Sequence, residues 1–194
     1  MKSDIQPFLL QRASLYKTIA GNRTFTGQIA CASKLIKTTI NSGGKILIFG
    51  NGGSAAQAQH FAAELVCRFE KDRQAIPAIA LTTDSSILTA QSNDDGFETV
   101  FSRQIEALCR HGDLVIGLTT SDSDISGHSY NIHNAFSVAN ERGAKSIGLF
   151  SQKTKNLLTL VDAPIIVPAV STALIQEVHQ TIIHLLCHLM EKEL

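Results

Sequence analysis

The chain has 194 residues, of which 44% are hydrophobic and 18% are charged. This composition is typical of a globular protein with a sizeable core, and it excludes a disordered or fibrous one. Lys and Arg together number 17, as do Asp and Glu, so no net charge attracts the chain to nucleic acid or to an anionic membrane. No apolar run is long enough for a membrane span or a signal sequence, and the four cysteines form no Cys-X-X-Cys pair. We therefore expect a cytoplasmic protein with reduced thiols.

Two helices are predicted before the first strand, over residues 8–21 and 25–42. Apolar residues recur with a helical period from Phe25 to Ile40, and two glycines then provide a stop. Because both helices precede the first strand, they are not crossovers within a βαβ unit. They pack either on another subunit, which would make the protein an oligomer, or on the chain's own sheet, and the sequence does not decide between the two.

A glycine-rich turn follows the first predicted strand. Residues 46–49 form a short apolar run, typical of a strand buried on both faces, and the turn GNGGS at residues 50–54 leads into an Ala-rich helix. Such a turn can hold an anion, because backbone N–H groups and the positive end of the helix dipole point at it. Ser54 is expected to cap the helix or to donate its hydroxyl to a ligand. The alternative is an ordinary α/β turn, since GNGGS matches neither a dinucleotide-binding nor a P-loop pattern.

Three functional side chains are predicted on the helix after this turn. His60, Glu64 and Arg68 follow one another at a spacing of four, which places them on one stripe of a helix. Such a stripe is most often a solvated, salt-bridged face. Its apolar neighbours, and the position of this helix over a sheet, favour a cleft instead.

Strands and helices alternate along the rest of the chain. Further strands are predicted at residues 78–81, 114–118, 146–150 and 165–167. Helical segments are predicted at residues 85–92, 97–109, from the end of a polar loop to Arg142, and at 172–192. This alternation predicts an α/β fold, a three-layer doubly wound parallel sheet with an N-terminal helix pair. We expect one domain over residues 1–194, with 1–42 as the N-terminal helices and 43–194 as the α/β core.

Ligand sites of such sheets lie beyond the C-terminal ends of the strands. Three loops leave strand ends there, at residues 50–54, 82–86 and 119–129. The cluster Thr119-Thr120-Ser121 offers hydroxyl and backbone donors that suit phosphate oxygens, although Ser and Thr are also common in ordinary loops.

The last helix carries polar residues within an otherwise apolar sequence. Gln176 and His184 are eight residues apart, which is close enough in angle to share a broad face. Buried Gln and His side chains need partners, and His60 and Glu64 could provide them, either as co-ligands of one metal or as an acid/base pair.

Four segments together resemble a known family, the sugar isomerase (SIS) domain proteins and, among them, the bacterial phosphoheptose isomerases. The segments are GNGGSAAQAQHFAAEL, AIPAIALTTD, SNDDGFETVFSRQIEAL and IQEVH with a later His. The resemblance runs from about Gly43 to the C-terminus. It implies an isomerase that converts sedoheptulose 7-phosphate into D-glycero-D-manno-heptose 7-phosphate, for the heptose of the lipopolysaccharide core. It also implies a homotetramer with active sites between subunits.

The resemblance also implies roles for individual residues. Glu64 and His184 match the family's catalytic residues. One zinc ion per subunit would be held by His60, Glu64, Gln176 and His184, although Gln is an unusual zinc ligand and a metal-free acid/base cluster is the alternative. The sugar phosphate would be bound by Asn51, Gly52, Gly53, Ser54, Arg68, Asn93, Asp94, Thr119, Thr120, Ser121 and Gln176.

Two features depart from the family pattern. The loop at residues 119–129 is about five residues longer than usual and carries Asp122 and Asp124, and Leu174 stands where an Arg is usual. Ionised aspartates cannot donate to a phosphate, so we expect both to point outward. The rival interpretation is a non-catalytic SIS protein that binds phosphosugars or a replication initiator. Because such relatives lack the acid/base pair, Glu64 and His184 favour an enzyme.

Overall fold

The computed structural model describes residues 2–123, 127 and 129–193. Within them, five parallel strands form one sheet in the order β2-β1-β3-β4-β5. The strands are β1 (Ile46–Gly50), β2 (Ala78–Ala80), β3 (Leu114–Leu118), β4 (Lys145–Ser151) and β5 (Ala163–Val167). All residues of β1 and β3 are buried, as expected for central strands covered on both faces. The predicted doubly wound parallel sheet is confirmed.

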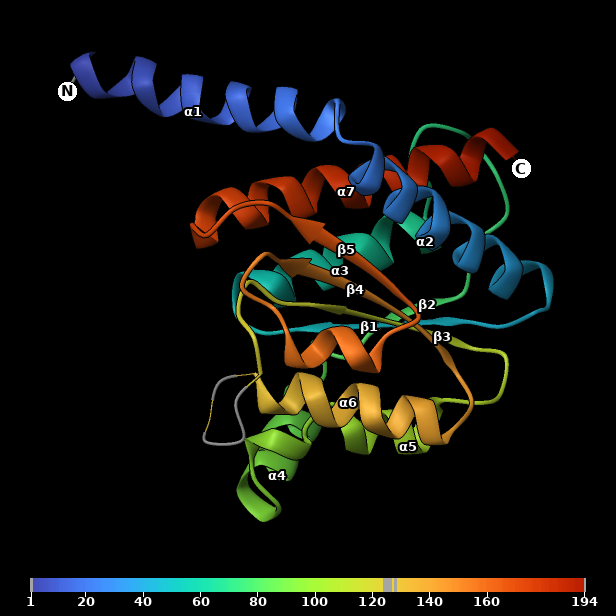
Figure 1. Ribbon diagram of the computed structural model, residues 1–194. Coiled ribbons are helices and arrows are strands. Elements are labelled where there is room, and N and C mark those ends of the chain that lie inside the picture. Colours follow the sequence, from blue (N-terminus) through green and yellow to red (C-terminus); the bar gives the residue numbers. More distant parts are fainter. Residues whose placement is uncertain (1, 124–126, 128, 194) are drawn as a thin grey trace.

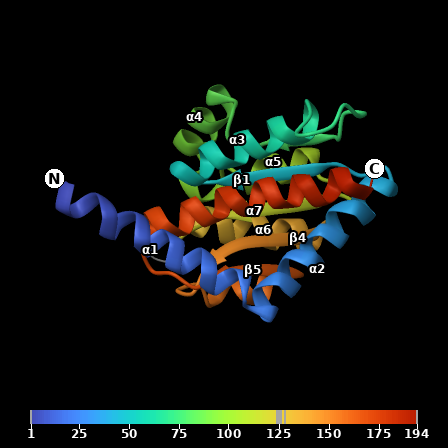
Figure 2. The same ribbon diagram turned by 90° about the horizontal axis from the view of Figure 1, so that it is seen from above.

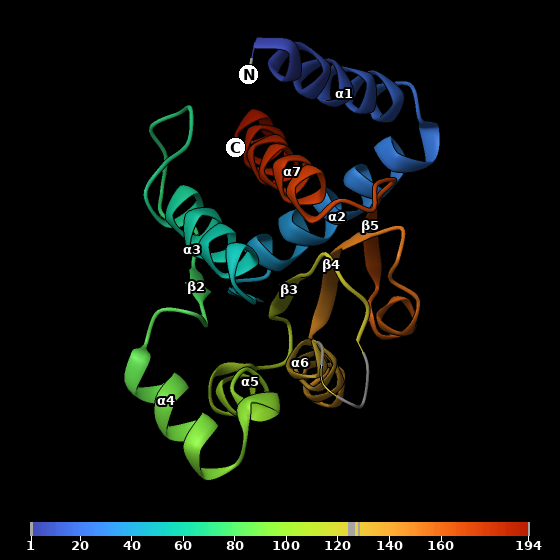
Figure 3. The same ribbon diagram turned by 90° about the vertical axis from the view of Figure 1, so that its left-hand side faces the viewer.

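Helices cover both faces of the sheet and make a three-layer arrangement (Figures 1 and 3). The helices are α1 (Lys2–Ala20), α2 (Arg23–Asn41), α3 (Gly53–Val66), α4 (Ser85–Asp94), α5 (Ser102–Leu108), α6 (Tyr130–Glu141) and α7 (Thr172–Glu193), with short 3-10 helices η1 (Phe97–Thr99) and η2 (Asn156–Leu160). In Figure 1, α2, α3 and α7 lie on one side of the sheet, and α4, α5 and α6 on the other.

Each face of the sheet has its own hydrophobic core. One core joins α2, α3 and α7 to the sheet, and the other joins α5 and α6 to it. In the second core, Phe49 and Phe136 pack edge to face with ring centroids 5.2 Å apart. Gly117 makes room for them, because a Cβ at this position would lie 2.5 Å from Phe136 and 2.8 Å from Phe49.

The two N-terminal helices behave differently. Helix α2 packs on the chain's own sheet, with Phe25, Ile29 and Ile36 in the core. Of the two alternatives expected from the sequence, another subunit or the chain's own sheet, α2 therefore follows the second. Helix α1 projects from the body (Figures 1 and 2). Its C-terminal half is attached through buried Ile19, through the ion pair of Arg12 with Glu177, 2.9 Å long, and through the Tyr16 hydroxyl, 2.8 Å from that of Thr181.

Several element boundaries differ from the sequence prediction. The helix predicted over residues 97–109 is divided into η1 and α5. Helix α4 runs to Asp94, two residues beyond the end predicted at residue 92. The short helix η2 was not predicted. Among the described helices, none combines the length and the apolar character that crossing a membrane would require.

Candidate active site

A cavity of about 560 Å³ lies at the C-terminal ends of the strands. Its walls come from the turn after β1, the loop after β3, the start of α6 and helix α7. In the strand order, β1 connects to β2 on one side while β3 lies on the other, so the crevice between their ends is a topological switch point, where ligands of such sheets bind. The predicted loops at residues 50–54 and 119–129 both reach this cavity, whereas that at 82–86 is not part of its wall.

The turn after β1 needs its glycines. Gly52 has a φ of +54° and is the N-cap of α3 without a side-chain capping bond, a conformation that favours glycine. A Cβ on Gly50 would lie 2.8 Å from the Cβ of Ser54 and 3.0 Å from the carbonyl oxygen of Leu118. Because Gly52 is the N-cap, Ser54 does not cap α3. It is buried in the first turn of α3 and lines the cavity, which leaves its hydroxyl for a ligand.

Asn51 is tied across the cavity to the start of α6. Its side-chain amide and that of Asn131 each donate to the other's oxygen, both at 2.9 Å. Asn131 is buried, so this reciprocal pair fixes the position of Asn51 relative to α6. The sequence contained no signal for Asn131, because the two residues are 80 positions apart.

The hydroxyl cluster after β3 lies on the cavity wall as expected. Thr120 and Ser121 line it, and the hydroxyl of Thr119 accepts from the backbone N–H of Ser121 at 3.1 Å and lies 3.2 Å from the hydroxyl of Ser129. The carboxylate of Asp122 points elsewhere, since it accepts from the backbone N–H of Asn156 at 3.0 Å. Asp124 lies outside the described residues, as do residues 125, 126 and 128 of this loop.

A second group of polar side chains lies between α3 and α7. Nε2 of His60 is 2.9 Å from Nε2 of His184 and 3.2 Å from Oε1 of Glu64. The potential ligand atoms of these three residues all lie within 4.8 Å of one another. Ligands of a tetrahedral zinc ion are about 3.3 Å apart, given bonds of about 2.0–2.1 Å, so the group fits a metal ion as well as a metal-free acid/base cluster.

The amide that contacts this group is Gln180, which the sequence analysis missed. Its Nε2 lies 3.0 Å from Nε2 of His184. Gln176, by contrast, lies one helical turn earlier and lines the cavity, where a Cβ on Gly53 would be 2.5 Å from its Nε2. A substrate contact for Gln176 agrees with this placement, and its role as a fourth metal ligand stays a prediction. The sequence signal that could have identified Gln180 is its spacing of four from His184, which places both residues on one face of the helix.

Three predicted binding residues lie apart from both groups. Arg68 does not share the stripe of His60 and Glu64, because α3 ends at Val66; that part of the prediction is wrong. Asn93 and Asp94 are exposed at the end of α4, where the Asn93 amide donates to the Asp94 carboxylate at 2.9 Å, and neither lines the cavity.

The cavity wall includes aromatic residues that were not predicted. Phe97 and Glu98 line it together with Tyr130. The ring of Tyr130 stacks on that of His133, with centroids 5.3 Å apart. No sequence pattern indicated these residues, since they reach the cavity only through the packing of η1 and α6.

Cys187, one turn beyond His184 on α7, is not a candidate ligand. Burial raises the pKa of its thiol to about 12, and the negative charge of Glu64 acts in the same direction. Among the described residues, the group of possible ligand atoms that lie close together contains His60, Glu64 and His184 but not this thiol.

A comparison with protein families identifies the architecture. The model for the SIS domain matches residues 13–151. The chain belongs to the SIS-domain family. This match confirms the family expected from the sequence, and it includes the cavity loops and all of α3, but not α7.

Curated relatives extend the similarity to the whole chain. The SIS-domain chain is 52% identical over 167 residues to a phosphoheptose isomerase of Geotalea daltonii, covering 86% of this chain and 84% of the relative. It is 45% identical over 194 residues to a phosphoheptose isomerase of Pelobacter propionicus, covering 100% and 99%. The structure resembles that of phosphoheptose isomerase from Neisseria gonorrhoeae, with a TM-score of 0.89, 34% identity and 98% coverage of both chains.

Proposed function

We propose that this protein is an aldose–ketose isomerase that converts sedoheptulose 7-phosphate into D-glycero-D-manno-heptose 7-phosphate. The observation that carries the proposal is the contact of His60 with both Glu64 and His184, on the two helices that also line the hydroxyl-rich cavity through Ser54 and Gln176. The chain is also about half identical to proteins named phosphoheptose isomerase. A non-catalytic binding module is not favoured, because it would not need this acid/base group.

The chemistry requires a proton to move between C1 and C2 of the sugar. In the proposed mechanism, the Glu64 carboxylate takes a proton from C1 while His184 protonates the carbonyl oxygen on C2, which gives an enediol. Glu64 then returns the proton to C2, and His184 accepts the proton of the C1 hydroxyl as the aldehyde forms. General acid–base groups of this kind contribute about 10²–10⁴-fold to rate.

The length of α3 between the cavity turn and His60 is comparable to that of a seven-carbon substrate. His60 follows Gly53 by seven residues on α3, which is about 10 Å of helix at 1.5 Å per residue. An extended seven-carbon chain, with C–C bonds of about 1.5 Å, spans roughly 8 Å. We propose that a phosphate at the hydroxyls of Thr120 and Ser121 leaves C1 and C2 directed toward Glu64 and His184, further along α3 and α7. Gln176, Gln180 and His184 follow one another at a spacing of four along α7, beside this path.

We further propose that the site holds one zinc ion per subunit, with His60, Glu64 and His184 as ligands and Gln176 as the predicted fourth. A bound zinc ion would supply positive charge beside the sugar oxygens that become negative during the reaction. Elemental analysis of protein purified without chelator should find about one equivalent of zinc. Less than about a tenth of an equivalent, together with activity that added zinc does not change, would support the metal-free cluster instead.

The test of the isomerase proposal is the substitution Glu64→Gln. It keeps the shape of the side chain but removes the base, so we expect turnover of sedoheptulose 7-phosphate to fall at least about a hundredfold. In D₂O, where the proton held by Glu64 can exchange with solvent before it is returned, proton NMR should show the wild-type enzyme incorporating deuterium at C2 of the product, and the variant should not.

The matched control is Glu106→Gln, which removes an exposed carboxylate paired with Arg103 on α5, away from the site. This variant should turn over at the wild-type rate. If Glu64→Gln keeps more than a tenth of wild-type turnover, the proposed role of Glu64 is wrong.

We also propose a homotetramer that buries the N-terminal half of α1. Ile5, Phe8, Leu9 and Leu10 are each 55–59% exposed, and three of them are consecutive, so they point to different sides of the helix. A helix that is apolar on several sides is normally surrounded by protein, and a symmetric assembly of identical chains would provide that surrounding.

Light scattering of the variant Leu9→Glu/Leu10→Glu tests the assembly. We expect wild-type protein to have the mass of four chains at micromolar concentration and the variant to have a smaller mass. The control Gln11→Glu adds charge next to this apolar stretch without removing apolar surface, and it should remain a tetramer. A monomeric wild type would contradict the proposal.

We propose that the protein acts in the cytoplasm, in the synthesis of lipopolysaccharide heptose. All four cysteines are described and none is disulfide-bonded, which agrees with a reducing compartment such as the cytoplasm. The resemblance to phosphoheptose isomerases supports a role in supplying heptose for the lipopolysaccharide core.

A further inference from the structure

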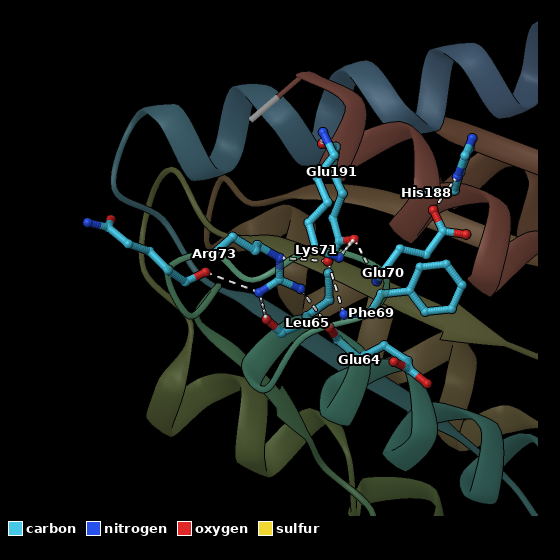
Figure 4. Close-up of polar contacts among 9 residues, drawn as sticks. Glu64, Leu65, Phe69, Glu70, Lys71, Arg73, His188 and Glu191 are labelled. Carbon is cyan, nitrogen blue, oxygen red and sulfur yellow. Dashed lines mark hydrogen bonds and ion pairs between the residues drawn. The ribbon is translucent and has the colours of Figure 1, made fainter.

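A buried carboxylate near the C-terminus of α7 holds the segment that follows α3. Glu191 is 1% exposed, and its carboxylate accepts the backbone N–H groups of Phe69, Glu70 and Lys71 at 3.0, 2.7 and 2.8 Å. It also accepts from Nε of Arg73 at 3.0 Å. Figure 4 shows these four donors converging on one side chain. Burial alone would raise the pKa of this carboxyl, but the backbone donors and Arg73 outweigh it and lower the pKa.

Arg73 extends the same contact to the end of α3. Its two terminal nitrogens donate to the backbone carbonyls of Leu65 at 2.8 Å and of Glu64 at 2.7 Å. Carbonyls in the last turn of a helix lack intrahelical partners, so Arg73 satisfies two of them. The guanidinium is itself largely buried, at 8% exposure. We call Glu191 and Arg73, with these contacts, the Glu191–Arg73 clamp.

The clamp joins the two helices that carry the acid/base group. Helix α3 carries His60 and Glu64, and α7 carries His184. The backbone carbonyl of Glu64 is itself one of the groups that Arg73 holds. The clamp therefore fixes the axial position of Glu64 on α3 relative to α7.

The clamp also places an aromatic ring against His184. The N–H of Phe69 is bound by Glu191, and the ring of Phe69 stacks on the imidazole of His184, with centroids 5.4 Å apart and an angle of 27°. The imidazole thus has Phe69 on one side, and it contacts His60 and Gln180 through Nε2. A shift of residues 69–71 would remove the support for one face of the ring.

We propose that Glu191 and Arg73 are positioning residues for the isomerisation, which hold Glu64 and His184 at the separation that proton transfer needs. The proposal rests on the catalytic roles given above to Glu64 and His184. Neither clamp residue touches the cavity wall, so neither is expected to bind the phosphate. A misplacement of reacting groups by about 1 Å can cost about a hundredfold in rate, which is why loosening the clamp should lower kcat.

Two substitutions loosen the clamp in different ways. Glu191→Gln keeps the shape but removes the charge that Arg73 and three N–H groups bind. Arg73→Lys keeps the charge but loses the planar fork that reaches two carbonyls at once. We expect each to lower kcat at 20 °C at least about tenfold while KM for sedoheptulose 7-phosphate changes less than about threefold.

The matched control is Asp113→Asn. Asp113 is also a buried carboxylate that accepts two backbone N–H groups, of Lys45 at 2.9 Å and of Arg110 at 2.7 Å, and it also pairs with a cation, Lys45. It lies before β3, at the opposite end of the strands from the cavity. Asp113→Asn should lower Tm like Glu191→Gln but leave kcat within about threefold of wild type.

Steady-state kinetics, measured well below each variant's Tm, test whether Glu191 and Arg73 are positioning residues. A folded Glu191→Gln with kcat within threefold of wild type, a loss caused by KM rather than kcat, or an equal loss in Asp113→Asn would each overturn the proposal. If Glu191→Gln does not fold, the same criteria apply to Arg73→Lys. Activity retained by Glu64→Gln would instead contradict the proposed mechanism, and so the two failures are distinguishable.

Discussion

His179 should make the protein lose stability in mild acid. It lies on α7 with no exposed surface, its Nε2 is 3.2 Å from the carbonyl oxygen of Phe150, and its Nδ1 has no hydrogen-bond partner among the described residues. Burial lowers its pKa from 6.5 to about 4. Between these values the unfolded chain binds the proton and the folded chain does not, so the free energy of unfolding decreases as pH falls. The cost at pH 5 is about 2 kcal/mol relative to pH 7.

Urea unfolding at pH 7 and pH 5, at one protein concentration, measures this cost. The variant His179→Gln cannot take up the proton but can still donate to Phe150, so its unfolding free energy should change by less than about 1 kcal/mol between the two pH values. Carboxylates contribute little in this window, because unfolded Asp and Glu have pKa values near 4. The same loss in variant and wild type would show that another group causes it, and no loss in wild type would refute the assigned burial effect.

Three further substitutions test individual contacts by kinetics and thermal melting. Gly53→Ala places a Cβ against the flexible end of the Gln176 side chain, which can move aside. Tm should therefore change by only a few degrees, while KM rises at least threefold. An unchanged KM would exclude a substrate contact of Gln176. Gln180→Leu removes a hydrogen bond to His184, worth about 1 kcal/mol, so kcat should fall several-fold at constant KM, and an unchanged kcat would count against this contact. Asp122→Asn removes the negative charge that accepts the N–H of Asn156 at the start of η2. The free energy of unfolding should fall by about 1 kcal/mol, and KM should change less than threefold. A tenfold gain in affinity for the sugar phosphate would show that Asp122 faces the phosphate.

Local patterns were sufficient for the sheet and for the turn that forms the cavity. The continuous apolar run of β1 and the glycines after it predicted a buried strand and a ligand-binding turn, since both depend on neighbours within a few residues. The hydroxyl cluster at Thr119–Ser121 could be placed for the same reason, because every loop after a parallel strand opens at the same edge of the sheet. The spacing of four between His60 and Glu64 was enough to put them on one helix face, and they lie 3.2 Å apart.

Contacts between helices far apart in sequence were decided only by tertiary packing. The spacing on α7 alone did not distinguish Gln176 from Gln180 as the partner of His184, because the axial position of α7 against α3 depends on how the two helices pack. Arg68 was misplaced because α3 ends at Val66, and no glycine or proline marks that end. Arg73 lies only 8 or 9 positions from the carbonyls that it binds at the end of α3, but the hold of Glu191 on the next segment depends on residues about 120 positions apart. Local spacing carries no information about such pairs, and only the folded chain brings them together.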